Sequence, residues 1–471
     1  GRKHMTEKIF LTFSLFTVCL GFMSYGYYVS RGRISQTSFL LSDRNVNSLS
    51  LTFSLTASCF GIWILIGPAE ASTWGGLGAV VGYACGQSFV FLYFTKVGVK
   101  IRKLFPSARS LTEAISKRYS IKVCKLVIGL TLLYLFVYFC AEVTAIAKVT
   151  NLILGTPLWL TAGLIIFSTL IYSLKGGLKI SIITDKFQFW IIIIFLIMIF
   201  YIFINEINFL SFELLNKFPS KINIEYNGFT AGLTFFIAVF ATNLFDQGIW
   251  QRVYAAKNID NLKKGFIGSF FIVICVIFLL GLVGIYASIT GAVKDPSTII
   301  FSILVNKEYI FLNLLILILS LTLVLSSLDT LIASISSLFI IHTQSFIKIK
   351  NINYLYITSG VILAGSALYV SSKGLSILYL FLLADLLCCS AAIPIFYGFY
   401  NNKIKSEKVY FSILLGVISG LLFFPSLDFS KSILVGGLLN KEIFPIFISN
   451  YLLFWSFVIG SLSPIIFLRK S

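Results

Sequence analysis

The sequence predicts an all-α protein that crosses a membrane many times, and three observations lead to this fold class. Hydrophobic residues make up 58% of the 471-residue chain, whereas charged residues make up only 12%. Apolar runs of about 20 residues, the length that crosses a bilayer as a helix, recur along the chain. Lys and Arg gather in the short segments between these runs, as at the cytoplasmic ends of membrane helices. The net charge of +19 therefore reflects orientation in a bilayer and not nucleic-acid binding.

The cysteines and histidines exclude several other kinds of chemistry. All eight cysteines lie in or at the edges of apolar segments, where they act as small apolar residues and not as disulfides or metal ligands. Only His4 and His342 are present, which excludes most histidine-based catalysis. The few acids and histidines form no catalytic set, so we do not expect an enzyme. The expected partners are a small organic solute and the lipid bilayer, with no nucleic acid, and the protein is expected to be a monomer.

The apolar runs divide the chain into about 13 membrane spans. They cover 8–28, 47–70, 76–98, 124–154, 157–174, 184–205, 229–250, 265–290, 309–340, 352–371, 375–399, 408–426 and 446–468. With the N-terminus outside, the basic loops 99–125, 251–264 and 402–408 fall on one side, together with most of the 37 Lys and Arg. By the positive-inside rule that side is the cytoplasm, where the C-terminus also lies. We expect a multi-pass protein of the plasma membrane, in a bacterium the inner membrane.

Two of these spans are interrupted by small or polar residues at matching places. The second span contains the stretch Thr56 to Gly61, and the seventh contains Ala241 to Asn243 followed by Asp246 to Gly248. Broken helices at corresponding places in two halves are typical of inverted-repeat transporters. Such breaks free backbone carbonyls for cations and helix ends for substrate. Isolated small residues such as Gly82, Gly86 and Gly281 are interpreted instead as sites of close helix packing.

The breaks suggest how the chain is organised. Residues 47–205 would form one five-helix repeat and residues 206–399 the second. Residues 1–46 would hold the first span and a cytoplasmic loop, and residues 400–471 two peripheral helices.

The ninth span carries a polar cluster in an otherwise apolar run. Ser326, Ser327, Asp329 and Thr330 lie within five residues of each other. A carboxylate inside a bilayer costs roughly 2.5–3.5 kcal/mol unless it finds a partner. Oxygen ligands of this kind suit a small hard cation. The alternative is that the hydroxyls bond back to carbonyls of their own helix.

Several motifs occur in a fixed order over about residues 30–400. They are Arg31-Gly32-Arg33 through Asp43-Arg44, Ser110 to Tyr119, Tyr172 to Gly177 with Thr184 to Gln188, and Asp246 to Arg252 with Ala255 to Lys257. Together they resemble the motifs of the sodium:solute symporter family. In two places the sequence departs from the family pattern: Ser42-Asp43 replaces Ala-Gly, and Thr112 and Glu113 are adjacent. The resemblance implies a LeuT-type 5+5 inverted repeat and sodium-driven uptake of a small solute by alternating access. Amino acids, quaternary ammonium compounds and urea-like solutes are the expected classes.

The resemblance also implies the ligands of a main sodium site. Backbone carbonyls of Ala57 and Phe60 in the first broken helix would face the carbonyl of Leu323 and the hydroxyls of Ser326 and Ser327. Leu323 and the two serines are one helical turn apart and share a face. Na⁺ is the expected coupling ion, with H⁺ as the alternative.

A second cation site or a proton site is implied at Asp185, Asp329 and Thr330. The family places an acid at the position of Asp185, on the sodium exit path, and the other two residues lie one turn beyond the serine pair. Two close carboxylates resist joint ionisation, which favours a bound cation or proton. The alternative is an ion pair with a Lys or Arg. Arg252, at the predicted cytoplasmic rim, is expected to neutralise Asp246 or a lipid phosphate.

The substrate is expected between the broken helices. By the same resemblance its candidate lining residues are Phe60, Trp63, Gln87, Phe236, Val239 and Asn243, with positions of the eleventh span. Cys59 stands where proline carriers have an acid, which argues against proline. Glu70 either attracts a cationic group to an outer vestibule or is an interface residue.

Three other functions stay open at this point. They are a proton-coupled symporter, a passive facilitator of the same fold and a transporter-like membrane sensor module. Intact Ser326 and Ser327 favour ion coupling.

Overall fold

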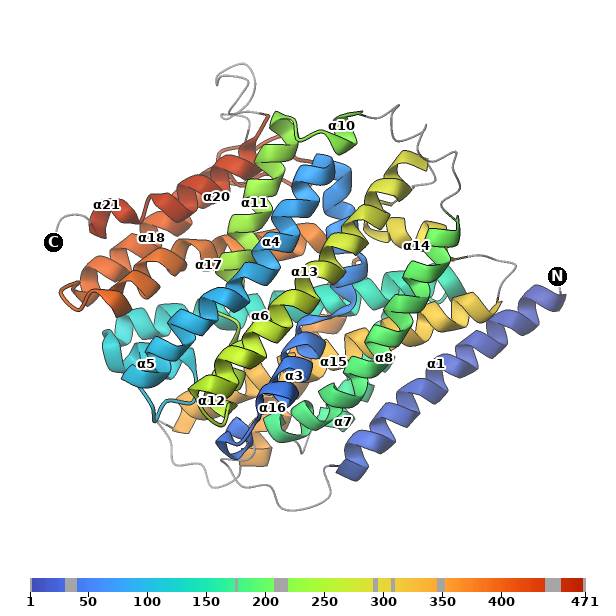
Figure 1. Cartoon of the computed structure of the whole chain (residues 1–471), viewed down its shortest axis with the longest axis horizontal. Coiled ribbons are helices and arrows are strands. Elements are labelled where there is room, and N and C mark those ends of the chain that lie inside the picture. The colour runs from blue at the N-terminus through green and yellow to red at the C-terminus, as the bar shows by residue number, and fades with distance from the viewer. Residues whose placement is uncertain are drawn as a thin grey trace.

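The computed structural model describes residues 2–29, 40–173, 177–206, 219–290, 295–305, 310–344, 352–436 and 450–468. The motif segment from Arg31 to Phe39, residues 174–176 of the third motif and parts of the outer loops 206–228 and 427–445 lie outside the described residues. Over the described ranges the chain is helical, and β-pairing is limited to isolated bridges. Figure 1 shows the helices packed around one another, with α1 and α21 at opposite sides of the bundle.

The described helices follow one another along the chain. The long ones are α1 (Arg2–Val29), α3 (Ser48–Cys59), α4 (Gly67–Leu104), α6 (Ile121–Leu154), α7 (Leu158–Ser173), α8 (Gly177–Glu206), α11 (Tyr226–Asn243), α12 (Gln247–Ala255), α13 (Ile259–Thr290), α15 (Ile310–Gln344), α16 (Ile352–Ser372), α17 (Ile377–Tyr400), α18 (Ser406–Phe423) and α20 (Leu452–Leu462). The short ones are α5 (Leu111–Arg118), α10 (Pro219–Ile222), α14 (Ile299–Leu304) and α21 (Ile465–Leu468), with 3₁₀ turns η1 (Ser42–Arg44), η2 (Ile62–Leu65) and η3 (Pro296–Thr298).

The all-α multi-pass class is confirmed, but the count of about 13 spans is not. Within the described residues, seven helices are long and apolar enough to cross a membrane, or eight if the bent pair α11–α12 is one span. Apolar parts of α1, α7, α16 and α20 are only 10–17 residues long. The predicted span 47–70 is also divided by the first break, into α3 (12 residues), η2 and the start of α4. The division into two repeats stays a prediction.

Both predicted helix breaks are present. Helix α3 begins after Asn47, whose side chain accepts a hydrogen bond from the Ser50 N–H, and it ends at Cys59. Phe60 leaves the helical conformation (φ −80°, ψ 86°), and η2 then leads into α4. Helix α11 ends at Asn243, and α12 leaves it at an angle of 52°. The unwound backbone of each break lies inside the protein, as a bilayer requires.

Glycines bring the neighbouring helices α4, α11 and α13 into close contact (Figure 1). A methyl group on Gly82 would lie 2.0 Å from the carbonyl oxygen of Gly232, and one on Gly281 would lie 2.3 Å from the Val80 side chain. At Gly86 it would lie 3.0 Å from the backbone of Phe236. The packing interpretation of these three glycines is therefore confirmed.

The most buried spans lie at the centre of the bundle. In the most apolar 18-residue stretch of each helix, 72% is buried inside the protein for α15 and 78% for α17, but only 28% for α18. Helices α15 and α17 are therefore central, and their polar residues such as Ser326 and Asp385 are buried, whereas α18 lies at the periphery.

We expect Gly82→Ala to destabilise the contact between α4 and α11. Its methyl group would overlap the Gly232 carbonyl, and overpacking of this kind costs about 1–3 kcal/mol. The melting temperature of the purified protein in detergent should fall. Gly129→Ala in α6 is the matched control, because the added methyl group meets nothing within 4 Å. Equal melting temperatures for the two variants would contradict the close packing.

Candidate functional site

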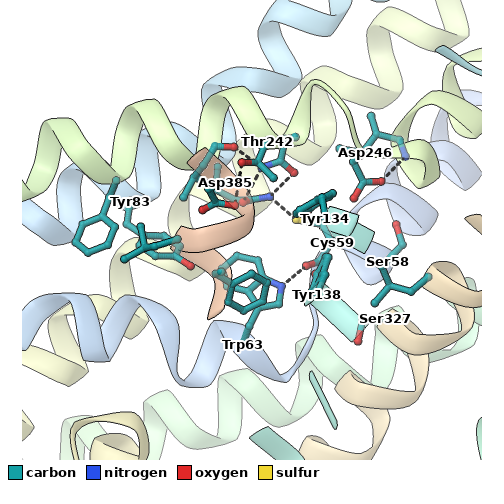
Figure 2. A pocket seen from close by; sticks show the side chains of 18 of the residues that line it. Ser58, Cys59, Trp63, Tyr83, Tyr134, Tyr138, Thr242, Asp246, Ser327 and Asp385 are labelled. Carbon is teal, nitrogen blue, oxygen red and sulfur yellow. Dashed lines mark hydrogen bonds between the residues drawn. The ribbon is translucent and has the colours of Figure 1, made fainter. Parts of the chain in front are cut away.

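A cavity lies between the two broken helices, enclosed by α4, α6, α15 and α17 (Figure 2). It offers about 50 Å³ to water-sized molecules, enough for a few waters. Its walls combine aromatic rings with amide, hydroxyl and carboxylate groups. Concave sites of this composition bind small solutes.

Four of the six predicted substrate residues line this cavity: Trp63, Gln87, Val239 and Asn243. The other two lie elsewhere. Phe60 is fully buried in the packed interior, and Phe236 lines grooves on the outer side of α11. The expected lining role of these two aromatic residues is therefore corrected, because their side chains point away from the space between the breaks.

The two amide side chains of the cavity are paired with each other. Asn243 Nδ2 donates to Gln87 Oε1 at 3.0 Å, and Gln87 Nε2 donates to Asn243 Oδ1 at 3.3 Å. Gln87 Nε2 also lies 3.0 Å from Cys59 Sγ, and Asn243 Nδ2 lies 2.7 Å from the Val239 carbonyl oxygen. This pair joins α4 to α11 across the cavity.

Two carboxylates in the cavity were not predicted as substrate residues. Asp246 caps α12 by accepting the Ile249 N–H at 3.0 Å, and Asp385 in α17 accepts the Thr242 hydroxyl at 2.9 Å. Both line the cavity (Figure 2). A sequence signal existed for Asp385, because an acid inside a membrane span marks a functional position.

Aromatic side chains form much of the remaining wall. Trp63 stacks on Tyr83 with ring centroids 5.8 Å apart, and its Nε1 donates to the Cys59 carbonyl oxygen at 3.0 Å. Tyr134 and Tyr138 lie one turn apart in α6 and face the same space. The hydrogen bond fixes the indole of Trp63 against the break.

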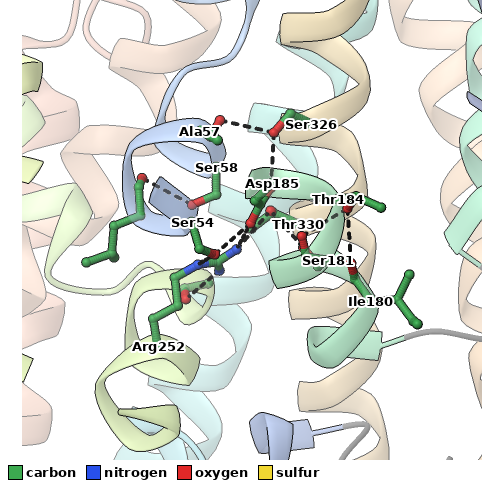
Figure 3. A network of polar contacts seen from close by, with 12 residues as sticks. Ser54, Ala57, Ser58, Ile180, Ser181, Thr184, Asp185, Arg252, Ser326 and Thr330 are labelled. Carbon is green, nitrogen blue, oxygen red and sulfur yellow. Dashed lines mark hydrogen bonds and ion pairs between the residues drawn. The ribbon is translucent and has the colours of Figure 1, made fainter. Parts of the chain in front are cut away.

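The serine pair of α15 faces the first break. Ser326 Oγ lies 3.1 Å from the carbonyl oxygen of Ala57 and 3.2 Å from Asp185 Oδ1 (Figure 3). Ser327 turns to the other side and donates to Glu142 Oε2 at 2.6 Å. The structure thus brings together Ala57 and Ser326 of the predicted sodium site. Phe60 follows at the break and Leu323 lies in the same buried stretch of α15.

Glu142, in α6, is a functional residue that the sequence analysis missed. Its carboxylate is fully buried and accepts hydrogen bonds from the backbone N–H groups of Ile62 at 2.9 Å and Trp63 at 3.1 Å. A methyl group on Gly61 would lie 2.4 Å from this carboxylate, which would have to move to make room for it. Glu142 therefore accepts hydrogen bonds from the two backbone N–H groups that the break leaves without helical partners, and it also accepts the hydroxyl proton of Ser327.

Asp185 is part of a buried polar network (Figure 3). Its Oδ2 lies 2.8 Å from Arg252 Nη2, with both side chains fully buried, and it accepts the Ser54 hydroxyl at 2.6 Å. Arg252 also donates to Ser54 Oγ at 2.8 Å and to the Gly248 carbonyl oxygen at 3.0 Å. The network joins α3, α8 and α12. Arg252 was expected at the cytoplasmic rim beside Asp246 or a lipid; it is instead an interior partner of Asp185, because α12 packs beneath α3.

The predicted second cation site contains this guanidinium. Thr330 Oγ1 lies 3.4 Å from Arg252 Nη2 and 3.5 Å from Ser181 Oγ. Asp329, the next residue in α15, is also buried. For Asp185 the ion-pair alternative therefore holds, and the positive charge comes from the protein itself.

Glu70 lies near the start of α4 and is only 4% exposed. Its Oε1 accepts the Ser376 hydroxyl at 3.1 Å, just before α17. Of its two predicted roles, this contact favours the interface.

Comparison with known proteins gives consistent results. The model of the sodium:solute symporter family matches residues 39–353. The spermidine transporter DUR31 of Candida albicans is 25% identical over 281 residues, which cover 57% of this chain and 53% of that protein. Sodium/glucose cotransporter 4 of Mus musculus is 25% identical over 289 residues, which cover 55% and 41%. The chain thus spans about half the length of these relatives.

Solved structures share the fold over nearly the whole chain. A Na⁺-coupled sialic acid symporter, in a substrate-bound outward-open state, superposes with a TM-score of 0.74 at 18% identity, covering 97% of this chain and 96% of that one. Mhp1, a nucleobase-cation-symport-1 family transporter in a closed conformation, gives 0.59 at 14% identity, covering 93% and 95%. The predicted LeuT-type fold is confirmed.

We expect Arg252→Gln to destabilise the protein strongly. It would leave Asp185 as a buried charge without its cation, a change that costs about 3–5 kcal/mol. Thermal unfolding in detergent measures the loss, and Asp185→Asn combined with Arg252→Gln should recover part of it.

The matched control for this variant is Lys264→Gln. Lys264 pairs with Asp260 at 2.8 Å, but the two side chains are 66% and 68% exposed. Exposed pairs contribute about 0–1 kcal/mol, so this variant should melt near the original temperature. Equal decreases in melting temperature for Arg252→Gln and Lys264→Gln would show that the buried ion pair contributes no more to stability than the exposed one.

Proposed function

Because this chain belongs to the sodium:solute symporter family, we propose that it is a secondary active transporter that couples the inward movement of Na⁺ to uptake of a small organic solute. Family membership makes it a multi-pass membrane transporter and not an enzyme. The observation that carries the proposal is the approach of Ser326 Oγ to the Ala57 carbonyl oxygen, 3.1 Å apart. The two groups lie 269 residues apart in sequence, in α3 just before the first break and in α15.

The proposed sodium site lies between the break of α3 and the serine pair of α15. Its ligands are the carbonyls of Ala57, Phe60 and Leu323 and the hydroxyls of Ser326 and Ser327. Because Ser327 donates its proton to Glu142, the lone pairs of its oxygen are available to a cation. Glu142 has no Lys or Arg within 4.0 Å among the described residues, so its negative charge favours a cation at this place.

Coupling follows from the position of the site. Na⁺ binds best when α3 and α15 are close, and the same approach encloses the cavity beside Cys59 and Ser327. A ligand shifts an equilibrium by its difference in affinity for the two states, so Na⁺ and solute stabilise the same enclosed state. Alternating access then carries both across the membrane.

The remaining details of the protein's setting are also proposals. We place the chain in a plasma membrane with the N-terminus outside and the C-terminus in the cytoplasm, as a monomer. Proton coupling is the second candidate mechanism, because Asp385 is a carboxylate in the cavity itself. A sensor module would bind the solute without accumulating it.

The names of the relatives do not select one cargo for this chain. Spermidine is a cation, glucose is uncharged and sialic acid is an anion, and the relatives named for them are at most 27% identical to this chain. The cargo must therefore be inferred from the cavity.

We expect Ser326→Ala combined with Ser327→Ala to abolish Na⁺-dependent accumulation in proteoliposomes, because two of the five proposed oxygen ligands are lost. Uptake of a panel of radiolabelled solutes under an imposed Na⁺ or H⁺ gradient measures this. Ser366→Ala is the control, since that exposed serine bonds back to the carbonyls of Ile362 and Leu363 in its own helix. Unaltered Na⁺ dependence in the double variant would refute the site, and accumulation driven by H⁺ alone would refute Na⁺ coupling.

We expect Glu142→Gln to weaken Na⁺ binding by about tenfold, because a neighbouring negative charge is removed while the side-chain shape is kept. Binding of radioactive Na⁺ to the purified protein measures this. Glu407→Gln, at the exposed start of α18, is the control. Equal Na⁺ affinity in Glu142→Gln and the unmodified protein would remove Glu142 from the site.

A further inference from the structure

Building on the transport function above, we propose that the cargo is an organic cation whose ammonium group is bound by Asp385, with Asp246 and the aromatic wall of the cavity completing the site. The charges of the cavity point first in this direction. Asp246 and Asp385 are the acids among its lining residues, and these include no Lys, Arg or His. The cavity is therefore negative, and an anionic cargo would be repelled.

Asp385 has no cation of its own among the residues that the structure describes. It is only 5% exposed, it accepts a hydrogen bond from Thr242, and no Lys or Arg lies within 4.0 Å of it. Arg252, whose positive charge acts on Asp246, is already bound by Asp185, Ser54 and the Gly248 carbonyl. A buried carboxylate without a counter-charge is costly, and a cationic cargo would supply that charge during each transport cycle.

The sequence places Asp385 toward the cavity through the helical repeat of α17. Leu378, Phe381, Leu382 and Asp385 are spaced i, i+3, i+4 and i+7, and all four line the cavity. Thr242 comes from the end of α11, at the second break. The hydroxyl of Thr242 holds one carboxylate oxygen, Oδ1, at 2.9 Å and thereby orients the group.

The amide groups argue against a sugar or a urea-like cargo. Recognition of such neutral solutes depends on amide and hydroxyl groups that are free to pair with them. In this cavity Gln87 and Asn243 are hydrogen-bonded to each other in both directions, at 3.0 and 3.3 Å. A neutral solute that uses these amides has to break this pair, whereas a cation can bind the carboxylates and leave it intact.

The aromatic wall suits a cation as well. Trp63, Tyr83, Tyr138 and Phe381 line the same space as Asp385. The faces of aromatic rings attract ammonium groups within about 6 Å, and the attraction strengthens where water is excluded.

The test uses the purified full chain in proteoliposomes with an inward Na⁺ gradient. Radiolabelled putrescine and choline are the cationic probes, glucose and urea the neutral ones, and sialic acid the anionic one. We expect accumulation of at least one cation and of neither neutral solute nor the anion. Accumulation of a neutral or anionic solute, with neither cation taken up or bound, would overturn the cation proposal while leaving Na⁺ symport in place. Binding of a cation without Na⁺-dependent accumulation would instead overturn the proposed transport function.

Variants then test the named carboxylates. Asp385→Asn should weaken binding of the cationic probe by about 10- to 100-fold, the loss expected for a hydrogen bond to a charged group. Binding of radioactive Na⁺ should persist, which also shows that the variant is folded. Asp246→Asn keeps the cap of α12, because Asn caps helices as well as Asp does, and should also weaken binding of the cation.

The control for charge removal is Asp260→Asn, on the exposed part of α13. It should leave binding of the cation unchanged. Unchanged cation affinity in Asp385→Asn, or accumulation of a neutral solute driven by a pH gradient that this variant abolishes, would overturn the assignment of Asp385 to an ammonium group.

Discussion

The constraint on which the rest of the structure depends is that a bilayer offers no hydrogen-bond partners to an unwound helix. The first break frees the N–H groups of Ile62 and Trp63, and the carboxylate of Glu142 accepts both. The same carboxylate accepts a hydrogen bond from the hydroxyl of Ser327. The residue that stabilises the break therefore also positions one ligand of the proposed sodium site. A side chain in place of Gly61 would displace this carboxylate. One interaction thus joins the broken helix to α6 and α15.

The second break is stabilised by a helix cap and a buried ion pair. Asp246 caps α12, while Arg252 in the second turn of the same helix pairs with Asp185 in α8 and with Ser54 in α3. The two breaks are therefore tied to each other through a buried ion pair below the cavity. Above the pair, Ser326 contacts both Asp185 and the Ala57 carbonyl, so the proposed ion site and the network share a residue. A substitution in the network is therefore expected to alter the proposed ion site, and a substitution in the ion site to alter the network.

The sequence predicted the features that depend on local pattern and missed those that depend on distant partners. Apolar runs, small residues at the breaks and the serine pair were visible in the sequence, as was the packing of Gly82, Gly86 and Gly281. Glu142 was missed because its partners lie 79, 80 and 185 residues away. Arg252 was placed at the rim because span length alone does not show that a short helix packs inside the bundle. Asp385 carried a signal, an acid in an apolar span, but only the fold brings it beside Thr242 and Asp246.

The reciprocal amide pair of Gln87 and Asn243 has a consequence for how relatives of this protein diverge. Since each amide oxygen accepts from the other side chain, replacing one of them alone leaves its partner's buried amide oxygen without this hydrogen bond. A change of cargo through these positions therefore requires two coordinated substitutions, in α4 and in α11. Asp385 and Thr242 are constrained less tightly, because the single hydroxyl proton of Thr242 has an alternative acceptor in the Ala238 carbonyl oxygen of its own helix. Selection can alter the charge of the cavity through a single codon in α17 while the amide bridge and the ion site are inherited unchanged.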